Sequence, residues 1–166
     1  MGIDTSFGKA YVKSQIGANQ TLPTSGKIFL SVKDDDKRSI VFIAKRLADL
    51  GFSIVSTRGT AKVLKSNGVN VEVVDRYDQG QHNMLNLMTL MKGNEIKLIV
   101  NTPSGESSQY DMRSIRAAAI LHNIPCITTL QGAWAAVNGI ESLKSKDITV
   151  QSLQEYYLAN NVAVNI

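Results

Sequence analysis

The chain has 166 residues, which is enough for one domain with a single hydrophobic core. Hydrophobic residues make up 43% of it and charged residues 19%, the composition of an ordinary globular protein. Its net charge of +4 comes from 18 basic and 14 acidic residues without blocks of one sign, which argues against nucleic acid as a partner. No apolar leader and no run of 18 apolar residues occur, so we expect a cytoplasmic protein with no membrane partner.

The first 26 residues differ from the rest of the chain. Residues 7–16 predict one short amphipathic helix, and a polar Asn/Thr/Pro/Ser/Gly stretch follows up to residue 26. Such a helix is too small to bury its apolar side by itself. We therefore expect it to pack on another part of the protein.

From Lys27 onward, short apolar runs rich in β-branched residues alternate with segments of helical periodicity. Strands are predicted at 27–32, 52–57, 70–75, 96–102 and 125–130. Helices are predicted at 36–50, 60–66, 83–92, 111–122 and 131–143. This alternation is typical of βαβ units, so we predict an α/β fold with a three-layer, doubly wound parallel sheet of about five strands.

In such sheets ligands bind outside the carboxyl ends of the strands. Hydroxyl, amide and cationic side chains follow the first four predicted strands, and they would meet at one edge of the sheet. These donors predict a pocket for a phosphate ester. The residues are Ser31, Lys37, Thr57, Gly59, Thr60, Arg76, Asn101, Thr102 and Ser104.

Two segments carry most of this prediction. Lys37 falls in the first turn of a helix, where the helix dipole disfavours a cation unless an anion shares the site. Gly59 allows close approach to a helix start that presents free N–H groups. Each segment also has a plainer explanation, because "KDDDK" reads as a solvated acidic helix start and Thr57 as an N-cap.

Other site chemistry finds little support. His82 and His122 are far apart, and no cysteine cluster completes a metal site. The single cysteine, Cys126, lies in the apolar run "IPCITTL", where we expect a small buried hydrophobic residue. The candidates for a general base are five carboxylates, which caps and turns also explain: Asp34, Asp35, Asp36, Asp75 and Asp78.

Several motifs taken together resemble the methylglyoxal-synthase-like domain. They are "LSVKDDDK", "STRGTA", "NTPSG", "DMRSIR" and "IPCITTL". The resemblance is strongest to the version that forms the C-terminal allosteric domain of the carbamoyl-phosphate synthase large subunit. It implies three parts: residues 1–26 as the tail of the preceding synthetase domain plus a linker, 27–158 as the allosteric domain, and 159–166 as a C-terminal tail.

The resemblance also implies roles for single residues. Lys37, Thr57, Gly59 and Thr60 would bind the phosphate of an effector nucleotide, with Arg76 in place of the family's usual lysine. The ribose and base would lie against Ser31, Asn101, Thr102 and Ser104, and Thr128 would face an ornithine site between domains. Two further departures are Pro103, which offers no donor, and Ala117, where the family often has an arginine.

The implied partners are a nucleotide such as UMP or IMP, ornithine, the other domains of the large subunit and a glutamine amidotransferase small subunit. No cofactor is implied for this domain, whereas the parent enzyme uses ATP, Mg and K. That enzyme makes carbamoyl phosphate for pyrimidine and arginine biosynthesis. The implied role of the domain is regulation of this synthesis.

Methylglyoxal synthase, which converts dihydroxyacetone phosphate, is the alternative within the same fold. In that family an aspartate base follows paired glycines after the third strand, whereas the present loop reads "DRYDQG". Because a base must lie within hydrogen-bond reach of the proton it removes, we expect no catalysis by this chain. A docking or oligomerisation domain with an empty pocket is the third reading that the sequence leaves open.

Overall fold

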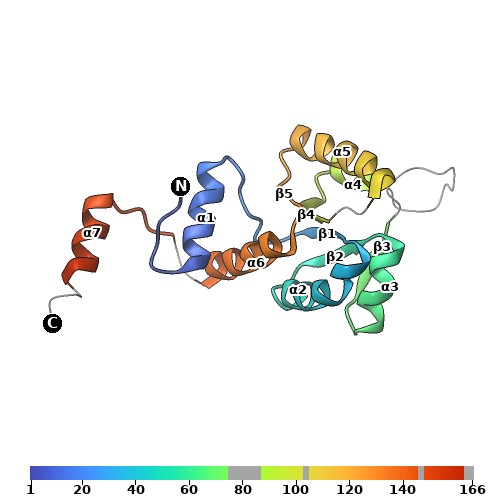
Figure 1. The fold of residues 1–166 in the computed structure, drawn as a ribbon, viewed down its shortest axis with the longest axis horizontal. Helices are drawn as coiled ribbons and strands as arrows, with labels where there is room; N and C mark the ends of the chain where they lie inside the picture. Colours follow the sequence, from blue (N-terminus) through green and yellow to red (C-terminus); the bar gives the residue numbers. More distant parts are fainter. Residues whose placement is uncertain (75–86, 103–104, 146–147, 163–166) are drawn as a thin grey trace.

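The computed structural model describes residues 1–74, 87–102, 105–145 and 148–162, the side chains of 105–112 and 159–162 excepted. A five-stranded, entirely parallel sheet forms its centre, with the strand order β3-β2-β1-β4-β5. The strands are β1 (Lys27–Ser31), β2 (Ser53–Ser56), β3 (Val71–Val73), β4 (Ile96–Asn101) and β5 (Cys126–Ile127). The predicted doubly wound α/β fold is therefore confirmed (Figure 1).

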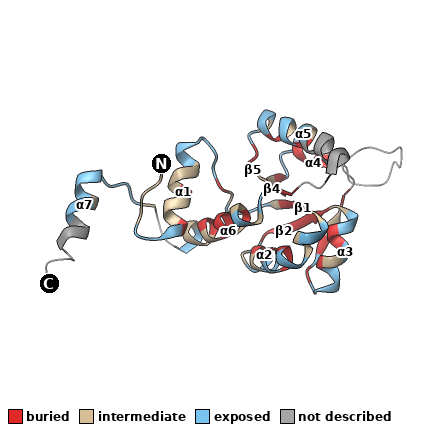
Figure 2. Ribbon diagram, in the orientation of Figure 1, coloured by how far each residue is buried: buried red, intermediate tan, exposed pale blue. Residues whose placement is uncertain are grey.

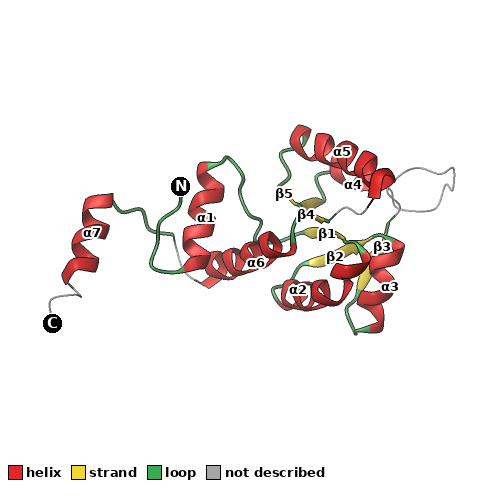
Figure 3. Ribbon diagram, viewed as in Figure 1, coloured by secondary structure: helices red, strands yellow, loops and turns green. Residues whose placement is uncertain are grey.

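Helices cover both faces of the sheet, as Figure 3 shows. They are α1 (Phe7–Gly17), α2 (Lys37–Asp49), α3 (Arg58–Ser66), α4 (Leu87–Lys92), α5 (Gly105–Leu121), α6 (Leu130–Ser145) and α7 (Leu153–Val162), and the 3-10 turn η1 (Asp34–Asp36) precedes α2. The helices α2, α3 and α6 lie on one face, and α4 and α5 lie on the other.

The two faces have separate cores because neighbouring residues of a strand point to opposite sides. Phe29, Val55 and Ile99 stand side by side in the register of β1, β2 and β4, and they pack with α4 and α5. Ile28 and Leu30 point the other way and pack with α2, α3 and α6. Figure 2 shows the buried residues following the strands and the inner sides of the helices.

The Leu/Met-rich segment before β4 packs on the sheet as its periodicity predicts, with Leu87, Leu90 and Met91 buried. Cys126 is half-buried against the same core, and burial raises the pKa of its thiol despite the positive charge of Arg116. The thiol therefore stays protonated near neutral pH and is a poor nucleophile.

Two helices differ from the prediction. The helix α5 begins at Gly105, six residues before the predicted start, and α7 was not predicted. The boundary expected after residue 158 falls inside α7. A capping box begins this helix, since Ser152 Oγ accepts from the Glu155 N–H at 3.2 Å and the Glu155 carboxylate accepts from the Ser152 N–H at 2.8 Å.

The helix α1 packs on α6, as expected of a helix that cannot bury its own apolar side. Val12 of α1 and Leu22 of the following segment are buried in the same core as Ile28 and Leu30 of β1. Figure 1 shows α1 and α6 side by side at one end of the sheet, with α7 beyond them. The helix α1 and Leu22 are therefore packed against the rest of this structure.

Candidate functional site

The strand order reverses between β1 and β4. The chain runs from β1 to β2 on one side, and the second half of the sheet, β4 and β5, lies on the other side. Ser31 and Asn101, the last residues of β1 and β4, are partners in the register. Ligands of doubly wound sheets bind at this reversal of strand order. The candidate site is therefore built around the ends of β1, β2 and β4.

Buried polar side chains gather at this edge. In the described part of the chain the buried polar residues are Ser31, Ser56, Thr60, Asn101 and Thr102, none more than 7% exposed. All five lie at or just after the ends of β1, β2 and β4. A buried polar group is costly unless it has hydrogen-bond partners. Their concentration at one edge thus marks this edge as different from the apolar interior.

Hydrogen bonds hold the strand ends together. The hydroxyl oxygens of Ser31 and Thr57 lie 3.3 Å apart, and either can donate. Thr102 binds the end of β1 and the segment after it, because its N–H donates to the Ser31 carbonyl at 3.0 Å and its Oγ1 accepts from the Lys33 N–H at 3.1 Å. Residues 26 to 71 positions apart in sequence are thereby fixed as one surface.

Thr60 has a structural function as well as its predicted one. It is 1% exposed, and its Oγ1 accepts from the Val32 N–H at 3.2 Å. This bond ties the first turn of α3 to the segment that follows β1. Ser56, which sequence reasoning missed, acts in the same way: its hydroxyl donates to the Leu30 carbonyl at 2.6 Å. Its position directly before Thr57 was the only available signal.

The start of α3 has the geometry of an anion-binding helix terminus. Thr57 occupies the N-cap position with an extended backbone, but among the described residues its side chain makes no capping bond. The plain N-cap explanation of Thr57 therefore does not fit this geometry. Gly59 in the first turn leaves the backbone uncovered, and the N–H groups of a first helical turn have no acceptor within the helix.

Lys37 places a positive charge next to the first turn of α3. It is the first residue of α2, and its Nζ lies 3.5 Å from the point where a Cβ would stand on Gly59. Its ammonium is 2.6 Å from the Asp34 carboxylate, which is 90% exposed, and Lys33 lies 3.7 Å from Asp35. The acidic turn η1 thus supplies the anion that a lysine at a helix start requires. An exposed pair of this kind is weak, so a phosphate could replace the carboxylate.

Three further predicted residues need separate mention. Arg76 and Ser104 lie outside the described residues, as do Asp75, Asp78 and His82. Thr128 is half-buried and follows β5, the edge strand beyond β4. The structure therefore brings together Ser31, Lys37, Thr57, Gly59, Thr60, Asn101 and Thr102.

The described residues offer neither a metal site nor a membrane span. No group of three or more His, Cys, Asp and Glu residues in the described ranges is placed to hold a metal ion. Among the helices described, none has the length and apolar character needed to cross a bilayer.

The fold matches a known class. The family model of the MGS-like domain matches residues 39–128, which is more than half of the chain, so the chain belongs to the MGS-like domain family. Methylglyoxal synthase from Elizabethkingia anophelis has a similar fold, with a TM-score of 0.56 and 16% identity over 82% of this chain and 92% of that one.

Within this class the chain is similar to a particular protein. It is 47% identical over 158 residues to the carbamoyl phosphate synthase large chain of Streptomyces coelicolor, covering 94% of this chain and 14% of the relative. It is 45% identical over 155 residues to the C-terminal section of that large chain in Methanocaldococcus jannaschii, covering 93% and 25%. The chain thus spans a small part of the length of these relatives.

Proposed function

We propose that this chain is the regulatory nucleotide-binding domain of a carbamoyl-phosphate synthase large chain. It binds the phosphate of a UMP- or IMP-type nucleotide at the carboxyl ends of β1, β2 and β4. The observation that carries the proposal is the juxtaposition of Lys37, Gly59 and Thr57 at the starts of α2 and α3. The identity to carbamoyl phosphate synthase large chains supports the assignment to that protein.

The chemistry of the site suits a phosphate ester. Lys37 supplies a fixed positive charge, the first turn of α3 supplies N–H donors, and the Thr57 hydroxyl supplies one more donor. Arg76 would add a planar cation that binds two phosphate oxygens. Ser31, Asn101, Thr102 and Ser104 would meet the ribose and base. Such a set of convergent donors fixes the orientation of a small anionic ligand.

The nucleotide would act as a signal. Its binding would control ATP-dependent carbamoyl phosphate synthesis, for pyrimidine and arginine biosynthesis, in domains beyond this chain, which work with a glutamine amidotransferase subunit. ATP, Mg and K belong to those domains. Ornithine would bind near Thr128 at a domain boundary. A coupling free energy of about 1–3 kcal/mol between effector and substrate sites is typical of such regulation.

The competing function is that of methylglyoxal synthase. We propose that this chain does not catalyse that reaction, because its loop after the third strand reads "DRYDQG" and has no Gly-Gly-Asp sequence. A general base has to reach the proton that it abstracts.

The test is isothermal calorimetry of this chain with UMP, IMP and inorganic phosphate. We expect a nucleotide to bind, and Lys37→Met to weaken binding by about tenfold or more, since a charge-assisted hydrogen bond contributes about 1.5–3 kcal/mol. Lys45→Met is the matched control, because Lys45 is an exposed lysine on the same helix. Absence of binding at millimolar nucleotide would refute the sensor, and methylglyoxal formed from dihydroxyacetone phosphate would favour the enzyme.

A further inference from the structure

The helices α1 and α6 cross at two glycines. A Cβ atom on Gly8 of α1 would lie 2.2 Å from Ser142 Oγ and 2.5 Å from the Asn138 carbonyl oxygen of α6. A Cβ on Gly139 of α6 would lie 2.9 Å from Leu22 Cδ1. Gly8 therefore lets the α1 backbone approach the α6 backbone closely, whereas a Cβ on Gly139 would crowd side chains, namely Leu22 and, at 3.1 Å, Val12 Cγ2 of α1. The docking of α1 on α6 is therefore specific and sensitive to single atoms.

This pair of helices lies outside the segment that the MGS-like family model matches, residues 39–128. Val12 of α1 is 1% exposed and Leu22 is 3% exposed, within the core that also contains the inner side of α2. The pair is thus firmly attached to the common fold although it stands apart from the matched segment.

The helix α2 connects the candidate site with α6. Lys37 begins α2 at the site, and Arg46 near its other end forms two hydrogen bonds with the Glu141 carboxylate of α6. The bond from Arg46 Nε to Glu141 Oε1 measures 2.9 Å, and the guanidinium lies 5.5 Å from the centre of the Trp134 ring on α6. Lys144 of α6 also donates to the Leu50 carbonyl at the end of α2. These contacts connect α2 with α6.

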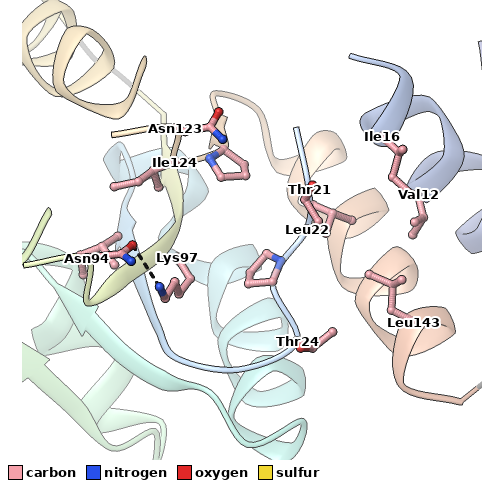
Figure 4. A pocket seen from close by; sticks show the side chains of 13 residues that line it. Val12, Ile16, Thr21, Leu22, Thr24, Asn94, Lys97, Asn123, Ile124 and Leu143 are labelled. Carbon is pink, nitrogen blue, oxygen red and sulfur yellow. Dashed lines mark hydrogen bonds between the residues drawn. The ribbon is translucent and has the colours of Figure 1, made fainter. Parts of the chain in front are cut away.

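A cavity of about 390 Å³ separates α1 from the amino ends of the strands. In Figure 4, Val12, Ile16 and Leu143 lie on one side of it, and Asn123 and Ile124 lie on the other. The helix α1 is thus held mainly by α6 and by the segment around Leu22. A shift of α1 relative to the sheet would meet open space on this side.

We propose that α1 is the element through which occupancy of the site is passed on: nucleotide binding at the starts of α2 and α3 is thermodynamically linked to the docking of α1 on α6, and α2 and α6 connect them. This inference rests on the proposed function and adds the direction in which the signal leaves the domain. Linkage is reciprocal, so a change in α1 docking must alter nucleotide affinity by the same factor.

The test compares Gly8→Ala with Gly17→Ala. Both glycines lie in α1, but a Cβ on Gly17 would meet no atom within 4 Å. UMP affinity is measured by calorimetry and α1 docking by amide hydrogen exchange of residues 7–17. We expect Gly8→Ala to speed exchange in α1 but not in β1, and to change the Kd for UMP by about fivefold or more, the lower end of typical couplings. Gly17→Ala should behave as the wild type.

Glu141→Gln provides an independent variant should Gly8→Ala fail to fold. It weakens the α2–α6 connection and leaves the two glycine contacts unchanged. We expect UMP still to bind, but no longer to slow exchange in α1. Asp49→Asn, an exposed change on α2, is the control.

Wild type that fails to bind UMP would refute the proposed function. Wild type that binds UMP, with equal Kd in the two glycine variants and no effect of UMP on α1 exchange, would refute the linkage alone.

Discussion

The Nζ atom of Lys37 lies 3.5 Å from the point where a Cβ atom would stand on Gly59. Lys37 begins α2 and Gly59 is the second residue of α3, so a cation and an uncovered stretch of backbone face each other at two helix starts. At that distance a methyl group would make ordinary contact with the ammonium without a clash. The effect of a side chain here on binding can therefore be separated from its effect on folding.

Gly59→Ala should raise the free energy of unfolding and weaken nucleotide binding. Alanine is favoured over glycine within a helix by about 0.5–1 kcal/mol, and we expect a gain of up to this size. The methyl group would stand between the Lys37 ammonium and the first turn of α3, so the Kd for UMP should rise about tenfold. Urea denaturation and calorimetry check the two effects. Unchanged affinity would show that the phosphate does not approach Gly59.

Asp34→Asn should strengthen nucleotide binding. In the structure the Asp34 carboxylate holds the Lys37 ammonium at 2.6 Å, where a phosphate would have to replace it. Because Asp34 is 90% exposed, the pair contributes at most about 1 kcal/mol, and the Kd for UMP should fall by up to about fivefold. Asp49→Asn, an exposed change at the far end of α2, controls for the change in net charge. Weaker binding in Asp34→Asn would mean that Asp34 positions Lys37 for the ligand.

Thr60→Val should destabilise the fold, whereas Thr60→Ser should be much milder. Valine leaves the buried N–H of Val32 without the acceptor that Thr60 Oγ1 provides at 3.2 Å, which costs about 1–3 kcal/mol. Serine keeps the hydroxyl and loses one methyl group. Urea denaturation of both variants measures the difference. Equal stability of the two variants would contradict the structural function of this hydroxyl. The same comparison shows which variant is stable enough for binding studies.

Lys27→Met should lower stability by about 1 kcal/mol at neutral pH. The Lys27 ammonium lies 3.0 Å from Glu95 and 3.1 Å from Glu72, and hydrogen bonds to Glu95 and then Glu72 raise its pKa. A raised pKa stabilises the fold at pH values below the unfolded pKa of about 10.4, and this contribution disappears as the pH rises through the folded pKa. Denaturation across that range, with exposed Lys62→Met as control, should show the difference between wild type and variant shrink at high pH.

The sheet could be predicted because its signals are local. Five short β-branched runs separated by helical periodicity leave few alternatives to a parallel α/β sheet, and Gly51 and Gly68, which close α2 and α3, adopt the positive φ that favours glycine. The sequence predicts the start of α5 six residues too late because "GESSQ" carries no apolar periodicity before Asp111. The helix α7 has no comparable sequence signal, because it exposes Leu153, Tyr157 and Leu158 and so lacks a buried apolar face.

The site could be predicted only as a set of residue types at strand ends. In the structure the side chains of Thr60 and Thr102 are buried and accept hydrogen bonds from the N–H groups of Val32 and Lys33. These bonds join residues 28 and 69 positions apart in the sequence, so no local pattern predicts them. The pairing of Lys37 with Asp34 was open from the sequence, since "KDDDK" fits both a solvated turn and an anion site. The contribution of Gly8 and Gly139 depends on the angle at which two helices cross, which no local pattern encodes.

The position of Trp134 gives this protein a built-in optical probe. It is the single tryptophan of the chain, and it lies on α6 beneath the guanidinium of Arg46 from α2. Selective excitation of tryptophan therefore reports one contact between two helices rather than an average over the fold. Any rearrangement of α2 against α6 should change the intensity or wavelength of this emission, so the junction can be followed in real time without a label.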